Sequence, residues 1–183
     1  LQGNTVDVKP DQLKTAIRNQ QITITNLTLT SDNRLVDTSE KQNQPQQKSE
    51  EQNIKDYIAK AKLLGLVKEI PTYCNHICYL IYKSETEHTL YIPDDVTRLN
   101  RGYGMLTFTE HIKDLKGNIK VIAGHRLKCA NYMFYCCQAQ SLDLSSFDTH
   151  NVTDMNSMFY CCQAQSLDLS SFDTHNVEYM NAM

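Results

Sequence analysis

The sequence has no tryptophan, and aromatic residues make up only 8% of its 183 residues. The hydrophobic fraction of 40% is also a little low for a globular chain. A chain of this length is enough for one ordinary domain or two small ones. The composition therefore allows a hydrophobic core, but not a large one.

An excess of basic residues is also missing, because the formal net charge is -3. Domains that bind nucleic acid usually carry a clustered basic face, so we expect no nucleic-acid partner. No apolar run approaches the ~20 residues that a membrane-spanning helix needs. Residues 1–14 have neither the basic start nor the apolar stretch of a secretory signal. We therefore expect no membrane span, and a cytoplasmic location is favoured.

Cysteine, in contrast, is frequent, with seven residues in the chain. Four of them form two adjacent pairs, Cys136–Cys137 and Cys161–Cys162, inside a repeated segment. Bridges between adjacent cysteines are strained, and the odd total leaves at least one thiol unpaired. We expect reduced, mostly buried cysteines that act as small apolar residues; a disulfide framework is the alternative.

The chain before the repeat reads as three parts. Residues 1–37 predict a short helix in "KPDQLKTAIRN" and then strands in "QITITNLTLTSDNRLV", where apolar residues alternate with polar ones. Residues 38–53 have no aliphatic side chain and predict a flexible linker or loop. Residues 54–116 predict an α+β capping region with a helix, a β-hairpin in "ICYLIYKSETEHTLYI" and a short helix near residues 109–115.

The strongest signal is an internal repeat. The segment "MFYCCQAQSLDLSSFDTHNV" begins at Met133 and again at Met158, and these two starts define the period of the repeat. A degenerate earlier unit starts near Gly117, so the array covers residues 117–183. A period in the twenties is typical of leucine-rich repeats, in which each unit packs on its neighbours.

Within each unit, "SLDLS" predicts a short strand with leucines inward, and "NVTDMNSMF" predicts a return helix with an apolar inner face. The predicted core residues of the two clean copies are Leu142, Leu144, Phe147, Val152, Met155, Leu167, Leu169 and Phe172. The fold class predicted is therefore α+β, with a small α/β N-terminal part followed by a short leucine-rich-repeat solenoid.

The segment "LDLSSFDTHNVTDMNSMFYCC" resembles the repeat of the BspA-like bacterial leucine-rich-repeat surface proteins, with His150 and His175 where that family usually has serine. The resemblance covers about residues 117–183. It implies a bacterial origin, a right-handed solenoid, a cell-surface location and binding of a protein or host surface. It does not imply an enzyme.

From these patterns we expect a non-enzymatic module that binds another protein, without a cofactor. The expected binding residues lie on the strand face and its rim, and they are Asp143, Ser145, His150, Asp168, Ser170 and His175. Structural self-association, including a homodimer through the C-terminal repeat, is one alternative. A small intracellular inhibitor or decoy from a mobile element is another.

Catalytic and metal motifs are weak. There is no nucleophile elbow and no phosphate-binding loop. In "CNHIC", Cys74, His76 and Cys78 would lie in line along a strand, too far apart for one tetrahedral ion. His150 and His175 are expected to stack, with Asp148 and Asp173 beside them, and two histidines with two carboxylates could take a transition metal. Identical repeats, however, stack identical residues without a purpose. The sequence therefore favours neither a catalytic centre nor a metal site.

Overall fold

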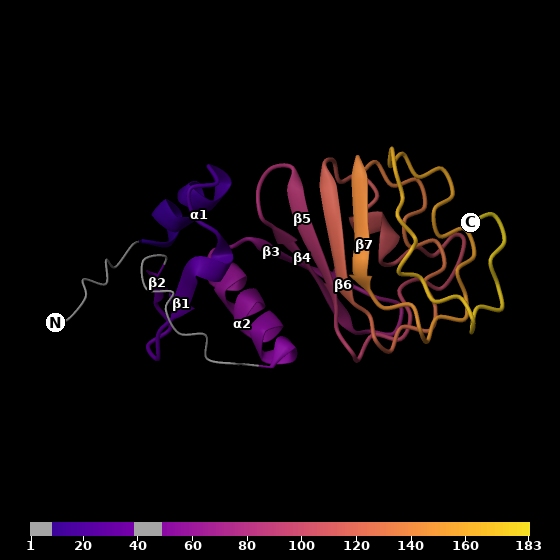
Figure 1. Ribbon diagram of the computed structural model, residues 1–183, viewed down its shortest axis with the longest axis horizontal. Coiled ribbons are helices and arrows are strands. Elements are labelled where there is room, and N and C mark those ends of the chain that lie inside the picture. Colours follow the sequence, from indigo (N-terminus) through magenta and orange to yellow (C-terminus); the bar gives the residue numbers. More distant parts are fainter. Residues whose placement is uncertain (1–8, 39–48) are drawn as a thin grey trace. The chain divides into compact units, whose positions relative to one another are not determined.

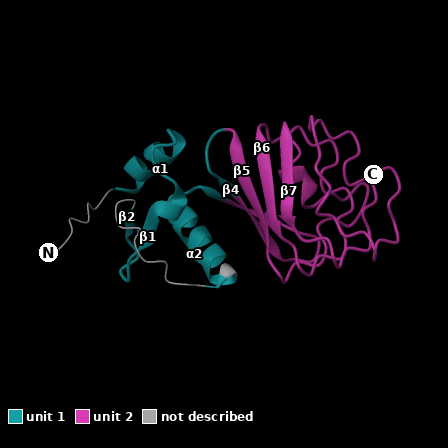
Figure 2. Ribbon diagram, in the orientation of Figure 1, with its two compact units in different colours: residues 1–67, 81–85 teal, residues 68–80, 86–183 magenta. Residues whose placement is uncertain are grey.

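The computed structural model describes residues 9–38 and 49–183 of the chain (Figure 1). It divides into two compact units, residues 1–67 with 81–85 and residues 68–80 with 86–183 (Figure 2). Most of the predicted linker lies outside the described residues. At the C-terminal end of the predicted linker, helix α2 begins at Glu50, whereas we predicted its start at Ile54. Residues 54–67 belong to the first unit, whereas we predicted them as part of the capping region.

The first unit contains two α-helices and a small sheet among its described residues. Its elements are α1 (Pro10–Arg18), a 3₁₀ turn (Ile24–Asn26), β1 (Leu27–Leu29), β2 (Leu35–Asp37) and α2 (Glu50–Leu63). Ser49 caps α2 by accepting a hydrogen bond from the backbone N–H of Gln52, and Gly65 follows its end with a φ of 65°. Neither helix of the described residues has the length and apolar character needed to cross a membrane.

The larger sheet has five strands within the described residues, in the order β3–β4–β5–β6–β7. Their bounds are Val67–Pro71, Ile77–Tyr82, Glu87–Ile92, Asn118–Ala123 and Ser141–Phe147. β5, β6 and β7 pair in parallel, with Leu90 beside Val121 and Ile119 beside Leu142. Because parallel strands need a long connection, the chain makes a full circuit before each next strand. We refer to residues 87–117, 118–140, 141–165 and 166–183 as layers 1 to 4.

The predicted return helices are absent from the described layers, and the reason lies in the backbone. In layer 2, the N–H groups of Ala130 and Phe134 donate to the carbonyls of Asp154 and Met158 in layer 3, at 2.9 and 2.8 Å. A helix would need these donors for its own i−4 carbonyls. Left-handed residues interrupt the segment as well, at Tyr132 and at Ser157, which is the equivalent position one repeat later.

The fold class that the sequence predicted is therefore wrong. The described residues form mostly sheet, with a five-stranded mixed sheet, a two-stranded sheet and two α-helices, and they give no leucine-rich-repeat solenoid. The strand of the repeat is present as β7 in layer 3, but in layer 4 only an isolated bridge joins Leu167 to Leu142.

The predicted core residues divide between the two copies of the repeat. Those of layer 3 are buried, namely Leu142, Leu144, Phe147, Val152 and Met155. Their equivalents in layer 4 are not, because no further described layer packs on them: Leu167 and Leu169 are exposed by 38% and 36%, and Phe172 is half-buried. Within the described residues, these three predicted core residues are therefore not buried. The homodimer through this layer stays a prediction.

Candidate functional site

The strand face carries the first group of predicted binding residues. Asp143 accepts hydrogen bonds from the backbone N–H and the hydroxyl of Ser145, at 3.1 and 2.6 Å, and Asp168 accepts one from the N–H of Ser170 at 2.9 Å. The hydrogen bonds from these serines hold the pKa values of both carboxyls below their usual range. The two aspartates therefore stay ionised, each turned toward its own strand.

The row of side chains that contains Asp143 and Asp168 also includes a lysine. Lys120 pairs with Asp143 across β6 and β7, and its Nζ lies 3.8 Å from the carboxylate. The parallel bridge from Leu142 to Leu167 continues the row to the neighbouring Asp168. One of the two negative charges is thus compensated in layer 2. The sequence analysis missed this because Lys120 lies in the degenerate unit.

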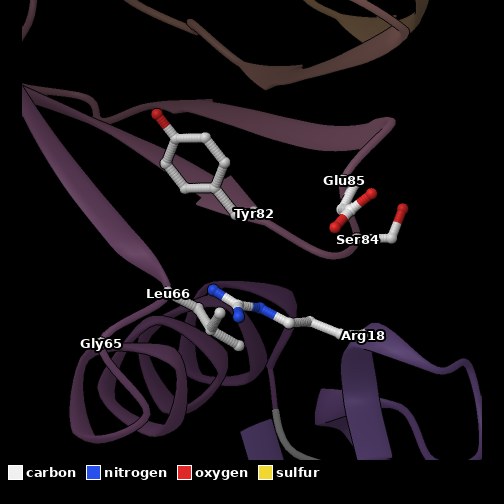
Figure 3. A pocket seen from close by; sticks show the side chains of 6 residues that line it. All are labelled: Arg18, Gly65, Leu66, Tyr82, Ser84 and Glu85. Atoms are coloured by element: carbon white, nitrogen blue, oxygen red, sulfur yellow. The ribbon is translucent and has the colours of Figure 1, made fainter. Parts of the chain in front are cut away.

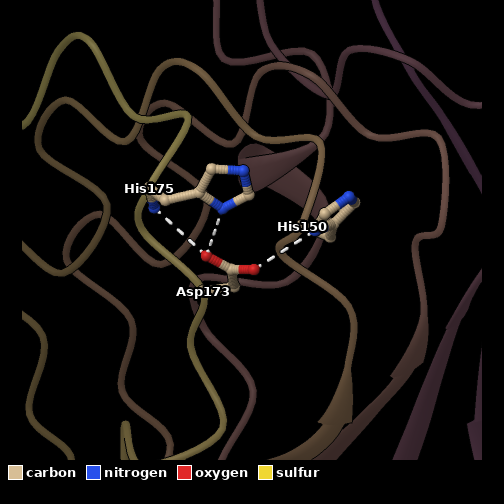
Figure 4. A group of neighbouring side chains, drawn as sticks. All are labelled: His150, Asp173 and His175. Carbon is tan, nitrogen blue, oxygen red and sulfur yellow. Dashed lines mark hydrogen bonds and ion pairs between the residues drawn. The ribbon is translucent and has the colours of Figure 1, made fainter.

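The rim carries three histidines, one in each of layers 2 to 4. His125 Nδ1 lies 2.9 Å from an oxygen of Asp148, and His150 Nδ1 lies 3.2 Å from an oxygen of Asp173. His175 turns back within its own layer, with Nδ1 2.6 Å from Asp173 (Figure 4). The hydrogen bonds from His175 and His150 keep the pKa of Asp173 well below its usual range. The structure thus brings His150 and His175 together, with Asp148 and Asp173 beside the histidines, as the period predicted.

A cluster of tyrosines lies on the turn segments, and the sequence analysis did not identify it. We call Tyr103, Tyr132, Tyr135 and Tyr160 the tyrosine cluster; their ring centroids lie 5.5–6.3 Å apart in successive contacts. Tyr135 and Tyr160 stack with planes 9° apart. Tyr103 is 78% exposed and Tyr160 46%. The repeat places Tyr160 at the position of Tyr135, so the stacking of these two rings could have been predicted from the sequence. The contact with Tyr103 could not, because Tyr103 lies outside the repeat.

A tight turn places Tyr103 on this surface. The N–H of Met105 donates to the carbonyl of Gly102 at 3.0 Å, and that of Arg101 donates to the carbonyl of Met105 at 3.2 Å. Gly104 has a φ of 85°, a conformation that other residues rarely adopt. The turn exposes Tyr103 together with Met105, which is 45% exposed.

Two cavities are lined by residues of a single unit. In the first unit, a cavity of about 320 Å³ is lined by Arg18, Gly65, Leu66, Tyr82, Ser84 and Glu85 (Figure 3). In the second, a more open one of about 370 Å³ is lined by Thr97, Arg98, Lys128, Cys129, Thr153, Asp154 and Tyr179. Burial raises the pKa of Cys129 to about 11, so this thiol stays protonated at neutral pH and is a poor nucleophile.

The "CNHIC" segment forms a turn rather than a continuous strand. The N–H and hydroxyl of Thr72 both donate to the carbonyl of His76, and β4 begins only at Ile77, so that Cys74 and His76 lie outside it. His76 Nδ1 pairs with Asp95 at 2.9 Å, while Cys78 is fully buried. These three residues are not among the described side chains that gather with the geometry of a metal site.

The seven cysteines are all free. In each adjacent pair, one cysteine is more buried than the other. Cys137 is fully buried and Cys136 half-buried, while Cys162 is half-buried and Cys161 exposed. Cys137 and Cys162 occupy the same position in layers 2 and 3. The neighbouring Cys137 thiol lowers the pKa of Cys162, whereas this contact and burial raise the pKa of Cys137.

We expect Cys162 to be the thiol whose alkylation begins at the lowest pH. Because the pKa of Cys162 is lowered, its thiolate is present at a lower pH than an ordinary cysteine thiolate, and it is lost as the pH falls through that lowered pKa. Changing Cys137→Ala removes the neighbouring thiol and is expected to slow alkylation of Cys162 at pH 7 by roughly tenfold or more. Iodoacetamide labelling followed by peptide mass spectrometry measures the rate. Cys136→Ala is the control, and equal slowing in both variants would contradict the pairing.

Residues 104–183 match the family model described as "Mycoplasma protein of unknown function, DUF285". No curated protein and no solved structure matches the chain. The family match covers less than half of the chain. It fits the bacterial origin that the sequence analysis expected, and it adds no support for leucine-rich repeats of the BspA type.

Proposed function

We propose that this chain is a non-enzymatic module that binds another protein, and that the tyrosine cluster is its main contact surface. The observation that carries the proposal is the exposure of tyrosine rings that contact one another across three successive layers. Tyrosine is enriched in protein interfaces and among the residues that dominate binding energy, while aspartate and serine are depleted there.

The packing of these rings favours binding on energetic grounds. Tyr135 lies between Tyr103 and Tyr160, with ring centroids at 6.3 and 5.5 Å. A side chain already held by its neighbours loses little conformational freedom when a partner covers it. The phenol hydroxyls can pair with polar groups of the partner while the rings cover its apolar groups. The cluster thus offers a preorganised surface that is partly apolar.

The strand face supports the proposal less strongly. Asp143 and Asp168 direct carboxylate oxygens toward their own serines, and Lys120 compensates part of the charge. A basic partner would have to compete with these contacts. We therefore place the predicted residues of the strand face at the periphery of the binding surface.

Changing Tyr103→Ser together with Tyr160→Ser is expected to weaken partner binding at least tenfold, because these are the most exposed rings of the cluster. The partner is first identified by affinity capture from lysate of the source organism, with the wild-type chain and the variant compared by quantitative mass spectrometry. Binding of the purified partner is then measured by biolayer interferometry.

Two further variants make the experiment specific. Tyr179→Ser removes a 53% exposed tyrosine that has no place in the cluster, and it should bind as the wild type does. Asp143→Lys with Asp168→Lys tests the strand face and should have a smaller effect. If the lysine variant loses the partner and the tyrosine variant keeps it, the tyrosine cluster is not the contact surface. If no protein binds saturably, the proposed function itself is wrong.

A further inference from the structure

The rim of layers 3 and 4 holds two imidazoles against one carboxylate. His150 Nδ1 approaches one oxygen of Asp173 at 3.2 Å, and His175 Nδ1 approaches the other at 2.6 Å (Figure 4). The two imidazole rings have centroids 5.2 Å apart. One donor atom from each of the three residues lies within 4.8 Å of the other two. The three side chains come from two layers and converge on one point.

These distances are close to those that a bound ion requires. With metal–ligand bonds of about 2.0–2.1 Å, two ligands of a tetrahedral ion lie roughly 3.3 Å apart. The two distances to Asp173 are at or below this value. The widest separation among the three donor atoms is up to 4.8 Å, so the two imidazoles must also turn toward each other when the ion binds. The histidine side chains are 59% and 57% exposed, which leaves them free to make that rotation.

The backbone around the carboxylate is held firmly. Thr149, which is 1% exposed, accepts a hydrogen bond from the N–H of Asp173 at 2.8 Å and donates one to its carbonyl at 3.2 Å. The N–H of His175 donates to the Asp173 carboxylate at 3.1 Å, and Asn176 donates to the carbonyl of His150 at 2.8 Å. Such outer contacts orient the ligands of metal sites.

We propose that His150, Asp173 and His175 bind a divalent transition-metal ion of the zinc type. Two imidazole nitrogens and one carboxylate oxygen suit zinc and its neighbours, whereas calcium and magnesium prefer oxygen ligands alone. Water completes the coordination on the exposed side, as in sites with three protein ligands. The ion takes the place of the hydrogen between each Nδ1 and the carboxylate, and each neutral imidazole then carries its hydrogen on Nε2. This site does not depend on the proposed protein binding.

The preceding layer provides a control within the same molecule. Residues at the equivalent positions are His125, Asp148 and His150. There, only His125 places Nδ1 against Asp148, at 2.9 Å, because Nδ1 of His150 faces Asp173. The same three residue types thus converge around Asp173 but not around Asp148. A metal ion should therefore bind at Asp173 and not at Asp148.

Zinc chloride added to the chelator-treated, ¹⁵N-labelled full chain is expected to shift the imidazole nitrogen signals of His150 and His175, with saturation at one equivalent. The signals of His125 should stay unchanged. Calorimetry should show at least tenfold weaker binding for His175→Ala and for Asp173→Asn, and binding within twofold of the wild type for His125→Ala and Asp148→Asn.

The seven free thiols could also take zinc, and the imidazole signals separate the two outcomes. If zinc binds while the signals of His150 and His175 do not move, the thiols hold it and the proposal is wrong. It is equally wrong if His125→Ala weakens binding as much as His175→Ala does. Circular dichroism of each variant shows that its fold is retained.

Discussion

Replacing Asn100 by leucine is expected to lower the free energy of unfolding by about 3–5 kcal/mol. This side chain is fully buried, and its amide makes four hydrogen bonds. Nδ2 donates to the hydroxyl of Thr109 at 2.8 Å and to the carbonyl of Asn131 at 2.9 Å. Oδ1 accepts from the backbone N–H groups of Phe108 and Thr109, at 3.0 and 3.2 Å.

Leucine has a similar volume but removes this partner from the N–H groups of Phe108 and Thr109 and from the carbonyl of Asn131. The hydroxyl of Thr109 keeps its hydrogen bond to the carbonyl of Tyr132 at 2.7 Å. Each buried polar group that loses its partner costs about 1–3 kcal/mol. Because Asn100 joins layer 1 to layer 2 and also ties down the segment at Phe108 and Thr109, the loss affects three segments at once. Urea unfolding, followed by circular dichroism and by tyrosine fluorescence, measures the change.

Asn156→Leu is the matched control, because it occupies the corresponding place in layer 3. Its side chain is half-buried, and its Oδ1 accepts a hydrogen bond from the N–H of Asn181 at 2.8 Å. We expect this variant to lose about 1 kcal/mol. Similar small losses in both variants would show that the buried network of Asn100 contributes less than the geometry indicates.

The second large effect is expected at Gly117, where Gly117→Ala should cost at least about 3 kcal/mol or prevent folding of the second unit. Gly117 has a φ of 83°, and an added Cβ would lie 2.2 Å from the carbonyl oxygen of Thr86. That oxygen also accepts the N–H of Asn118 at 2.7 Å, and the carbonyl of Gly117 accepts the N–H of Gln140 at 2.7 Å. The clash is with the backbone of Thr86, just before β5. This backbone cannot move by itself, because hydrogen bonds join the starts of β5, β6 and β7.

Gly104→Ala separates the two causes of this cost. Gly104 has nearly the same φ, 85°, but no atom lies within 4 Å of an added Cβ. This variant should lose only the roughly 1–2 kcal/mol of a left-handed residue with a side chain. The midpoints of thermal unfolding give the comparison. Equal midpoints for the two variants would mean that the strands separate easily at Gly117.

Part of the candidate site could be predicted from the period of the sequence. The offset between the two copies places His150 beside His175 and Asp143 beside Asp168, because neighbouring layers stack equivalent positions. The period does not say which aspartate each imidazole faces. That depends on side-chain rotation, and it differs between His150, which faces the next layer, and His175, which faces its own.

The helix at Pro10–Arg18, the strands β4 and β5, and the inward residues of layer 3 such as Leu142 follow from the local sequence. These features depend on neighbours along the chain and on the alternation of apolar residues. In contrast, the turns in the segment after each strand depend on contacts between layers. The apolar residues of this segment do have helical spacing. Its backbone N–H groups, however, donate to carbonyls of the next layer, one repeat further along the chain. A local sequence pattern cannot predict partners that lie so far away. The exposure of Leu167 and the place of Tyr103 in the tyrosine cluster are likewise set by which layer lies beside each residue.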